Sequence, residues 1–134
     1  MPKPLIYIAA PLFNEGERAL NDAIRTTLID AADVYLRQLD GTLLAEAIER
    51  GEAPEFATKE VFRRDIEALQ RCDILLIVLN GRVVDEGAAF ELGVAWALGK
   101  TCVAFKNDPR QLLAIGDNPM IAQAVSASSE VLCR

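Results

Sequence analysis

The chain has 134 residues, of which 51% are apolar and 25% charged, as is typical of a globular protein that folds as one domain. Its net charge of −6 argues against binding to a nucleic-acid polymer, because such binding depends on dense lysine and arginine facing phosphates. No apolar run reaches the roughly 20 residues that cross a bilayer, and the N-terminus lacks a signal-peptide pattern. We therefore expect a single cytoplasmic domain over residues 1–134, with no membrane partner.

The sequence contains no histidine, which excludes Ser-His-Asp and Cys-His catalysis. Its cysteines lie far apart and form no C-x-x-C pair, so a zinc site is not expected; they are Cys72, Cys102 and Cys133. If the protein is an enzyme without a redox cofactor, carboxylates or a tyrosine must carry the chemistry. Carboxylates alone suit glycosidic bonds, where one attacks and another handles the proton.

The first half of the chain begins with an apolar run at residues 5–10 that predicts a buried strand. Asn14 can cap the helix that follows, which we expect to end near Ala32. The elements predicted next are a strand at 34–36, a turn at 40–41, a helix at 43–50 capped by Thr42, and a break at 51–54.

The second half has the strongest strand signal, a continuous apolar run at residues 74–79 that fits a central parallel strand. A helix that starts at Thr58 and ends near Arg71 precedes this strand. The elements predicted after it are a turn at 80–81, a helix at 87–99, a strand at 101–105, a turn at 108–109, a helix at 118–123 and a last strand at 131–132.

Because strands and helices alternate, we predict an α/β fold with a flavodoxin-like, five-stranded parallel sheet and helices on both faces. Ligands of such sheets bind beyond the carboxyl ends of the strands, where the strand order reverses. The loops after the first and third strands, residues 9–14 and 80–87, are therefore the expected location of a site.

The predicted helix at residues 87–99 reads GAAFELGVAWALG and is apolar on every face except for Glu91, so we expect it to be buried. A lone carboxylate there is costly unless it is paired or hydrogen-bonded. Because Glu91 lies near the positive end of the helix dipole, with small neighbours beside it, it is a candidate nucleophile. The alternative is that Glu91 only caps a backbone amide or pairs with an arginine.

Three other side chains are candidates for the same site, and each has an ordinary structural alternative. Asp85 precedes the helix and, with Glu91, can flank a small ligand across Gly87, or it can simply cap the helix. Asp65 lies on the preceding helix, where Arg63 or Arg64 could pair with it at the surface. Tyr7 could orient a carboxylate through its hydroxyl or could be an ordinary core residue.

Taken together, the segments around these residues resemble the nucleoside 2-deoxyribosyltransferase family. The matching segments are IYIAAPLF at 6–13, DIEALQRCD at 65–73, DEGAAFELG at 85–93 and NPMIAQ at 118–123. The resemblance implies that Glu91 attacks the anomeric carbon of a 2'-deoxynucleoside and that a free nucleobase then takes the sugar from the covalent intermediate. It further implies that Tyr7 holds Glu91, that Asp65 and Asp85 bind substrate and manage protons on the base, and that no metal or cofactor is used.

The resemblance also implies where the substrate binds. The expected substrate-binding residues are Ala9, Phe13, Gln38, Asp40, Gly87, Asn118 and Met120, of which Gln38 and Asp40 match the family only loosely. In the family the segment that matches 118–120 reaches the sugar pocket of a neighbouring subunit. We therefore expect a homo-oligomer, at least a dimer, with sites shared between subunits.

Two alternatives to base transfer stay open. Water in place of the second base would make the protein an N-glycosidase of 2'-deoxynucleosides or of their 5'-monophosphates, although Glu15 and Glu17 in the loop after the first strand disfavour a phosphate. The other alternative is a non-catalytic nucleoside-binding module. The sequence does not distinguish purine from pyrimidine substrates.

Overall fold

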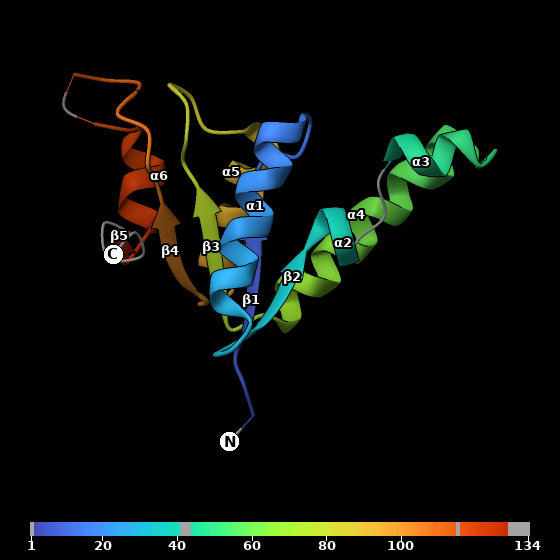
Figure 1. The fold of residues 1–134 in the computed structure, drawn as a ribbon, viewed down its shortest axis with the longest axis horizontal. Coiled ribbons are helices and arrows are strands. Elements are labelled where there is room, and N and C mark those ends of the chain that lie inside the picture. Colours follow the sequence, from blue (N-terminus) through green and yellow to red (C-terminus); the bar gives the residue numbers. More distant parts are fainter. Residues whose placement is uncertain (1, 41–43, 115, 129–134) are drawn as a thin grey trace.

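The computed structural model describes residues 2–40, 44–114 and 116–128, and these residues form an α/β fold with a parallel sheet (Figure 1). Four full strands make the sheet, and a two-residue strand, β5 (Ala127–Ser128), pairs with one edge. The strand order is β2-β1-β3-β4-β5, which is the order of flavodoxin-like sheets. The full strands are β1 (Leu5–Ala9), β2 (Asp33–Leu36), β3 (Ile74–Val78) and β4 (Thr101–Phe105).

The predicted α/β class and parallel sheet are thus confirmed, whereas the described residues form four full strands and the two-residue β5 where a five-stranded sheet was predicted. The edge pairing with β4 extends only over Ala127 and Ser128. The strand predicted at residues 131–132 lies outside the described part of the chain.

Helices cover both faces of the sheet because alternate strand residues point to opposite sides. Tyr7 and Leu75 belong to one buried cluster, together with residues of helices α4 (Pro54–Arg71) and α5 (Glu86–Ala97). Ile8 and Leu76 belong to the cluster on the other face, which includes residues of helix α1 (Glu15–Leu28). The site residues Glu91 and Asp65 lie on the helices of the first face.

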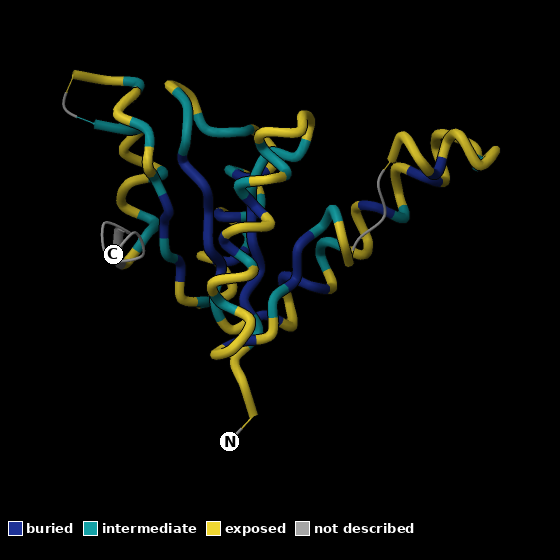
Figure 2. The backbone as a smooth tube through the Cα atoms, in the orientation of Figure 1, coloured by how far each residue is buried: buried dark blue, intermediate teal, exposed yellow. Residues whose placement is uncertain are grey.

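Three short helices complete the fold: α2 (Arg37–Asp40), α3 (Leu44–Glu49) and α6 (Pro119–Ala124). Helix α3 and the first half of α4 extend away from the sheet as a helical pair, most of whose residues are exposed (Figures 1 and 2). The contact between them buries Ala47 and Ala57 completely. Small side chains allow the two helices to approach closely there.

Several predicted boundaries differ from the observed ones. Helix α4 begins at Pro54 and not at Thr58. Proline fits the first helical position, because the backbone N–H that it lacks would have no hydrogen-bond partner within the helix there. Helix α1 ends at Leu28, although Asn14 does cap it by accepting a hydrogen bond from the Glu17 amide at 2.9 Å. A helical turn, α2, occupies the position of the turn predicted at 40–41; Gly41 and the predicted cap Thr42 lie outside the described residues.

No helix in the described ranges is both long and apolar enough to span a membrane.

The central strand β3 should carry much of the stability of the fold. Leu75 is completely buried, so Leu75→Ala removes packed atoms that the neighbours cannot replace, and we expect a loss of about 2–5 kcal/mol in the free energy of unfolding. Urea denaturation measures this loss. The matched control is Leu98→Ala, because Leu98 is 49% exposed and its loss should cost far less. Equal losses in the two variants would contradict the observed core.

Candidate functional site

Tyr7 and Glu91 form the centre of the site. Tyr7 lies in the middle of β1 and is completely buried, and its hydroxyl donates a hydrogen bond to Oε2 of the partly buried Glu91. Glu91 can reach it because α5 packs against β1, β3 and β4. The partner of Glu91 is therefore a tyrosine hydroxyl, and not the arginine or backbone amide of the structural alternative.

The surroundings of Glu91 change its acidity. Burial raises the pKa of Glu91 to about 7, the hydrogen bond from Tyr7 opposes this rise, and the negative charge of Asp65 adds to it. Burial, together with the charge of Glu91, raises the pKa of Tyr7 far above its usual value. Near neutral pH, Glu91 thus exists in both forms, while Tyr7 stays protonated and remains a donor.

Asp65 lies on α4 beside this pair and has two partners that the sequence analysis missed. Tyr35 donates a hydrogen bond to Oδ1 of Asp65 at 3.2 Å, and Nε of Arg37 lies 3.4 Å from Oδ2. The pairing of Asp65 with Arg63 or Arg64 that we considered is wrong, because both arginines form ion pairs with Glu60. Asp65 is therefore held from the β2 side and not by its own helix.

Glu91 and Asp65 line one cavity of about 260 Å³ between α4 and α5, which we call the Glu91 cavity. Arg37 and Gly87 also line it, so the structure brings the predicted residues Glu91, Asp65 and Gly87 together, with Tyr7 buried behind Glu91. The remaining lining residues are mostly apolar: Leu44, Thr58, Val61, Phe62, Ile66, Leu69 and Phe90. The rings of Phe62 and Phe90 lie 6.2 Å apart and form an aromatic wall of a kind that suits a nucleobase.

Asp85 immediately precedes α5 and does not line the Glu91 cavity. It caps this helix by accepting a hydrogen bond from the Ala88 amide at 2.9 Å, and it lines a second cavity of about 580 Å³, the Asp85 cavity. A side chain at position 87 would crowd the Asp85 carboxylate, since a Cβ atom there would lie 3.3 Å from Oδ2. Asp85 and Glu91 thus line adjacent cavities and not a single one, although the charge of Asp85 contributes to the raised pKa of Glu91.

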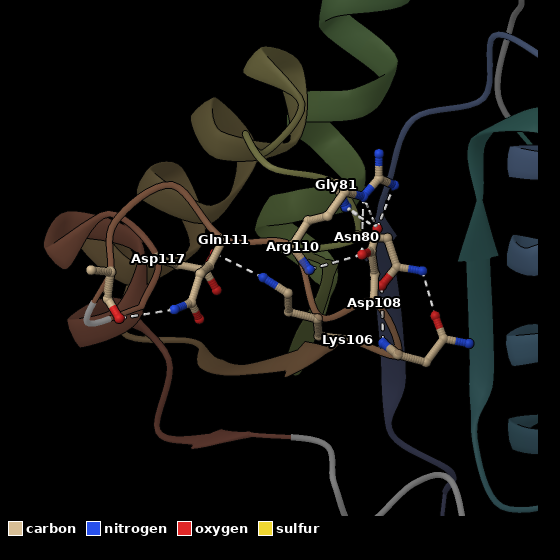
Figure 3. Close-up of polar contacts among 9 residues, drawn as sticks. Asn80, Gly81, Lys106, Asp108, Arg110, Gln111 and Asp117 are labelled. Atoms are coloured by element: carbon tan, nitrogen blue, oxygen red, sulfur yellow. Dashed lines mark hydrogen bonds and ion pairs between the residues drawn. The ribbon is translucent and has the colours of Figure 1, made fainter.

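The wall of the Asp85 cavity is braced by hydrogen bonds between the loops that follow β3 and β4 (Figure 3). Asn80 donates to the Asn107 side chain and accepts from the Asn107 amide. The Asp108 carboxylate accepts from the Gly81 amide at 2.8 Å and pairs with Arg110 at 2.5 Å (Figure 3). These contacts fix the start of the loop that leads to Asp85.

The predicted substrate-binding residues have different surroundings. Phe13 is 74% exposed and lines the Asp85 cavity. The amide of Gln38 is turned toward α1, where it accepts a hydrogen bond from Asn21 and donates to the carbonyl of Arg18. Asp40 accepts a hydrogen bond from the Leu36 amide, and Ala9 is completely buried. Gln38, Asp40 and Ala9 line neither of the two cavities.

Asn118 and Met120 also lie apart from Glu91 within this chain. Asn118 caps α6 by accepting a hydrogen bond from the Met120 amide. Met120 is 80% exposed and, with Trp96, lines an apolar groove of about 470 Å³ between α5 and α6. The expectation that α5 is buried on all sides is wrong for the single chain, because only one of its faces packs on the sheet while Phe90 and Trp96 stay more than half exposed.

Within the described residues, no group of three or more cysteine, aspartate and glutamate side chains is placed to hold a metal ion.

The raised pKa of Glu91 predicts how its removal affects stability. Because the folded chain holds a proton at Glu91 more tightly than the unfolded chain, the contribution of Glu91 to stability is fully present below about pH 4.5 and is lost as the pH rises through about 7. Glu91→Gln should therefore stabilise the protein relative to wild type by an amount that grows with pH, up to about 3 kcal/mol. Thermal denaturation across this pH range measures the difference, with Glu86→Gln on the exposed face of α5 as the control. A difference that is independent of pH would contradict the raised pKa.

Comparisons with known proteins connect this geometry to a family. The model of the nucleoside 2-deoxyribosyltransferase family matches residues 6–130. A 2-deoxyribosyltransferase from Bacillus psychrosaccharolyticus has a similar structure, with 25% identity and a TM-score of 0.75 over 92% of this chain and 84% of that one. A comparison with curated proteins found no match.

Two further solved structures are similar to the chain. A 2-deoxyribosyltransferase from Leishmania mexicana is 28% identical, with a TM-score of 0.54 over 80% of this chain and 66% of that one. A CMP N-glycosidase from Clostridium botulinum shares the fold at 18% identity, with a TM-score of 0.53 over 92% of this chain and 84% of that one. The family match spans nearly the whole chain and includes Tyr7, Asp65, Asp85 and Glu91. The chain therefore belongs to the nucleoside 2-deoxyribosyltransferase family.

Proposed function

We propose that the protein transfers a 2-deoxyribosyl group between nucleobases through a covalent glycosyl intermediate on Glu91. The observation that carries this proposal is the partly buried hydrogen bond from Tyr7 to Glu91 at the wall of the Glu91 cavity, which Asp65 also lines. A carboxylate that is partly dehydrated, fixed by one donor and open to a cavity has the properties of a nucleophile.

In the proposed reaction, a carboxylate oxygen of Glu91 attacks the anomeric carbon C1' of a 2'-deoxynucleoside. The C1'–N bond breaks as the C1'–O bond forms, and the electron pair of the broken bond leaves with the base, which takes up a proton. A second base then attacks C1' through its nitrogen, loses a proton and releases the Glu91 carboxylate. Since Tyr7 donates to Oε2, the other oxygen, Oε1, is free to attack.

We assign the remaining proposed roles from the positions of the side chains. Asp65 lines the Glu91 cavity and is placed to accept a hydrogen bond from the base, while Asp85 and Phe13 line the adjacent cavity. The orientation of Gln38 toward α1 does not favour direct contact with the base unless its side chain turns.

We further propose that a second copy of the chain completes the site. Asn118 and Met120 do not line the Glu91 cavity of their own chain, so they would act in the site of a neighbour. The exposed aromatic surface of α5, formed by Phe90 and Trp96 beside Met120, supports burial against another subunit. The whole chain would then act as one domain within a homo-oligomer.

Product analysis tests the transfer reaction. Purified protein is incubated with deoxyinosine, with and without adenine, and the nucleosides are separated by chromatography. We expect deoxyadenosine only when adenine is present. Glu91→Gln should lower its formation by a factor on the order of 10³ or more, because the amide cannot replace the carboxylate nucleophile.

The control for this experiment is Glu86→Gln, which makes the same substitution at an exposed position of α5 and should keep wild-type turnover. Release of hypoxanthine at the same rate with and without adenine, and without any deoxyadenosine, would show an N-glycosidase instead. Binding of deoxyinosine without turnover by the wild type would show a nucleoside-binding module. Either result would overturn the proposed transfer.

A further inference from the structure

Tyr35 near the carboxyl end of β2 and Arg37 at the start of α2 lie against Asp65 and engage different oxygens of its carboxylate. The hydroxyl of Tyr35 donates to Oδ1 at 3.2 Å, and Nε of Arg37 lies 3.4 Å from Oδ2. Tyr35 is buried, and the side chain of Arg37 is only 29% exposed. Both are therefore held in place by the fold and not merely attracted to a surface carboxylate.

Tyr35 also contacts the other half of the site. It is the register partner of Tyr7 in the pairing of β1 with β2, and the two rings stack with centroids 5.1 Å apart and planes inclined by 21°. The hydroxyl of Tyr7 points to Glu91, and the hydroxyl of Tyr35 points to Asp65. One stacked pair of tyrosines thus supports both carboxylates of the Glu91 cavity.

We propose that Tyr35 and Arg37 are positioning residues that hold Asp65 as an ionised hydrogen-bond acceptor facing the Glu91 cavity. This inference rests on the proposed function for its catalytic consequence, but its structural content concerns the charge and placement of Asp65 alone. An ionised carboxylate can only accept hydrogen bonds, so Asp65 would bind an N–H group of the base and would not act as the acid that protonates the leaving base.

Three effects set the pKa of Asp65. Burial is the largest and keeps the pKa of the Asp65 carboxyl above its usual value, while the positive charge of Arg37 and the hydrogen bond from Tyr35 oppose this rise and so favour the ionised form. The other titratable groups that face Asp65 are Tyr7 on β1, which is neutral, and Glu91 on α5, whose negative charge disfavours a second anion nearby. Without its two partners, Asp65 would bind a proton at a higher pH.

Titration by carbon-13 NMR of the side-chain carboxyl groups tests the inference without any substrate. The Asp65 resonance is assigned from its loss in Asp65→Asn. We expect the midpoint of Asp65 to rise by about one pH unit in Tyr35→Phe and in Arg37→Gln, and Arg37→Lys should restore most of the wild-type value because it retains the charge. The matched control is Arg64→Gln, since Arg64 is the next residue to Asp65 in sequence but pairs with Glu60.

Kinetics then tests the catalytic consequence. Because the pKa of Glu91, about 7, sets the acid limb of the pH profile, the comparison is made at about pH 8, where Glu91 is ionised. There kcat/KM for deoxyinosine should fall in Tyr35→Phe and Arg37→Gln, Arg37→Lys should restore most of it, and Arg64→Gln should keep the wild-type value. A loss of folded protein would also lower the activity. Thermal denaturation of each variant identifies such a loss. If the wild type converts no deoxynucleoside, the proposed function fails while the titration still decides the inference. An Asp65 midpoint that is unchanged in both variants, or that shifts equally in Arg64→Gln, would overturn it.

Discussion

The hydrogen bond from the Tyr7 hydroxyl to the Glu91 carboxylate joins the centre of the sheet to the helix that covers it. A carboxylate in such a position is costly to bury, and a single donor from β1 offsets only part of that cost, so Glu91 keeps a raised pKa of about 7. The rest of the site follows from this constraint. Helix α5 must lie across β1, β3 and β4 to deliver Glu91, and α4 lies beside it with Asp65.

The N-terminus of α5 divides the functional surface into two cavities with different chemistry. The Glu91 cavity has an aromatic wall and holds Asp65 and Arg37, while the adjacent cavity is lined by Asp85, Phe13 and polar side chains such as Asn80. Gly87 stands at the boundary, where a side chain would crowd the Asp85 carboxylate. This division is consistent with a substrate that has an aromatic base and a polar sugar, bound on either side of the bond to be broken.

The sequence predicted the fold class and indicated several residues of the candidate site, because both leave local signals. The lone charge in the apolar segment at 87–99 pointed to Glu91, and Asn14 and Asp85 cap helices as their positions indicated. Tyr35 and Arg37 were missed because their contacts with Asp65 depend on how β2 packs beside β1 and α4, which no short segment records. Aligning β1 with β2 would have placed Tyr35 beside Tyr7 and so made Tyr35 a candidate for the site.

The most direct test of the role of Glu91 is the capture of its covalent intermediate. The protein is mixed with deoxyinosine in the absence of an acceptor base, quenched in acid, and analysed by mass spectrometry of the intact chain and of its peptides. Attack by Glu91 predicts a mass increase of one deoxyribosyl group, located on the peptide that contains Glu91 and absent from Glu91→Gln. Turnover that leaves no adduct under single-turnover conditions, or an adduct on a different residue, would contradict the proposed nucleophile.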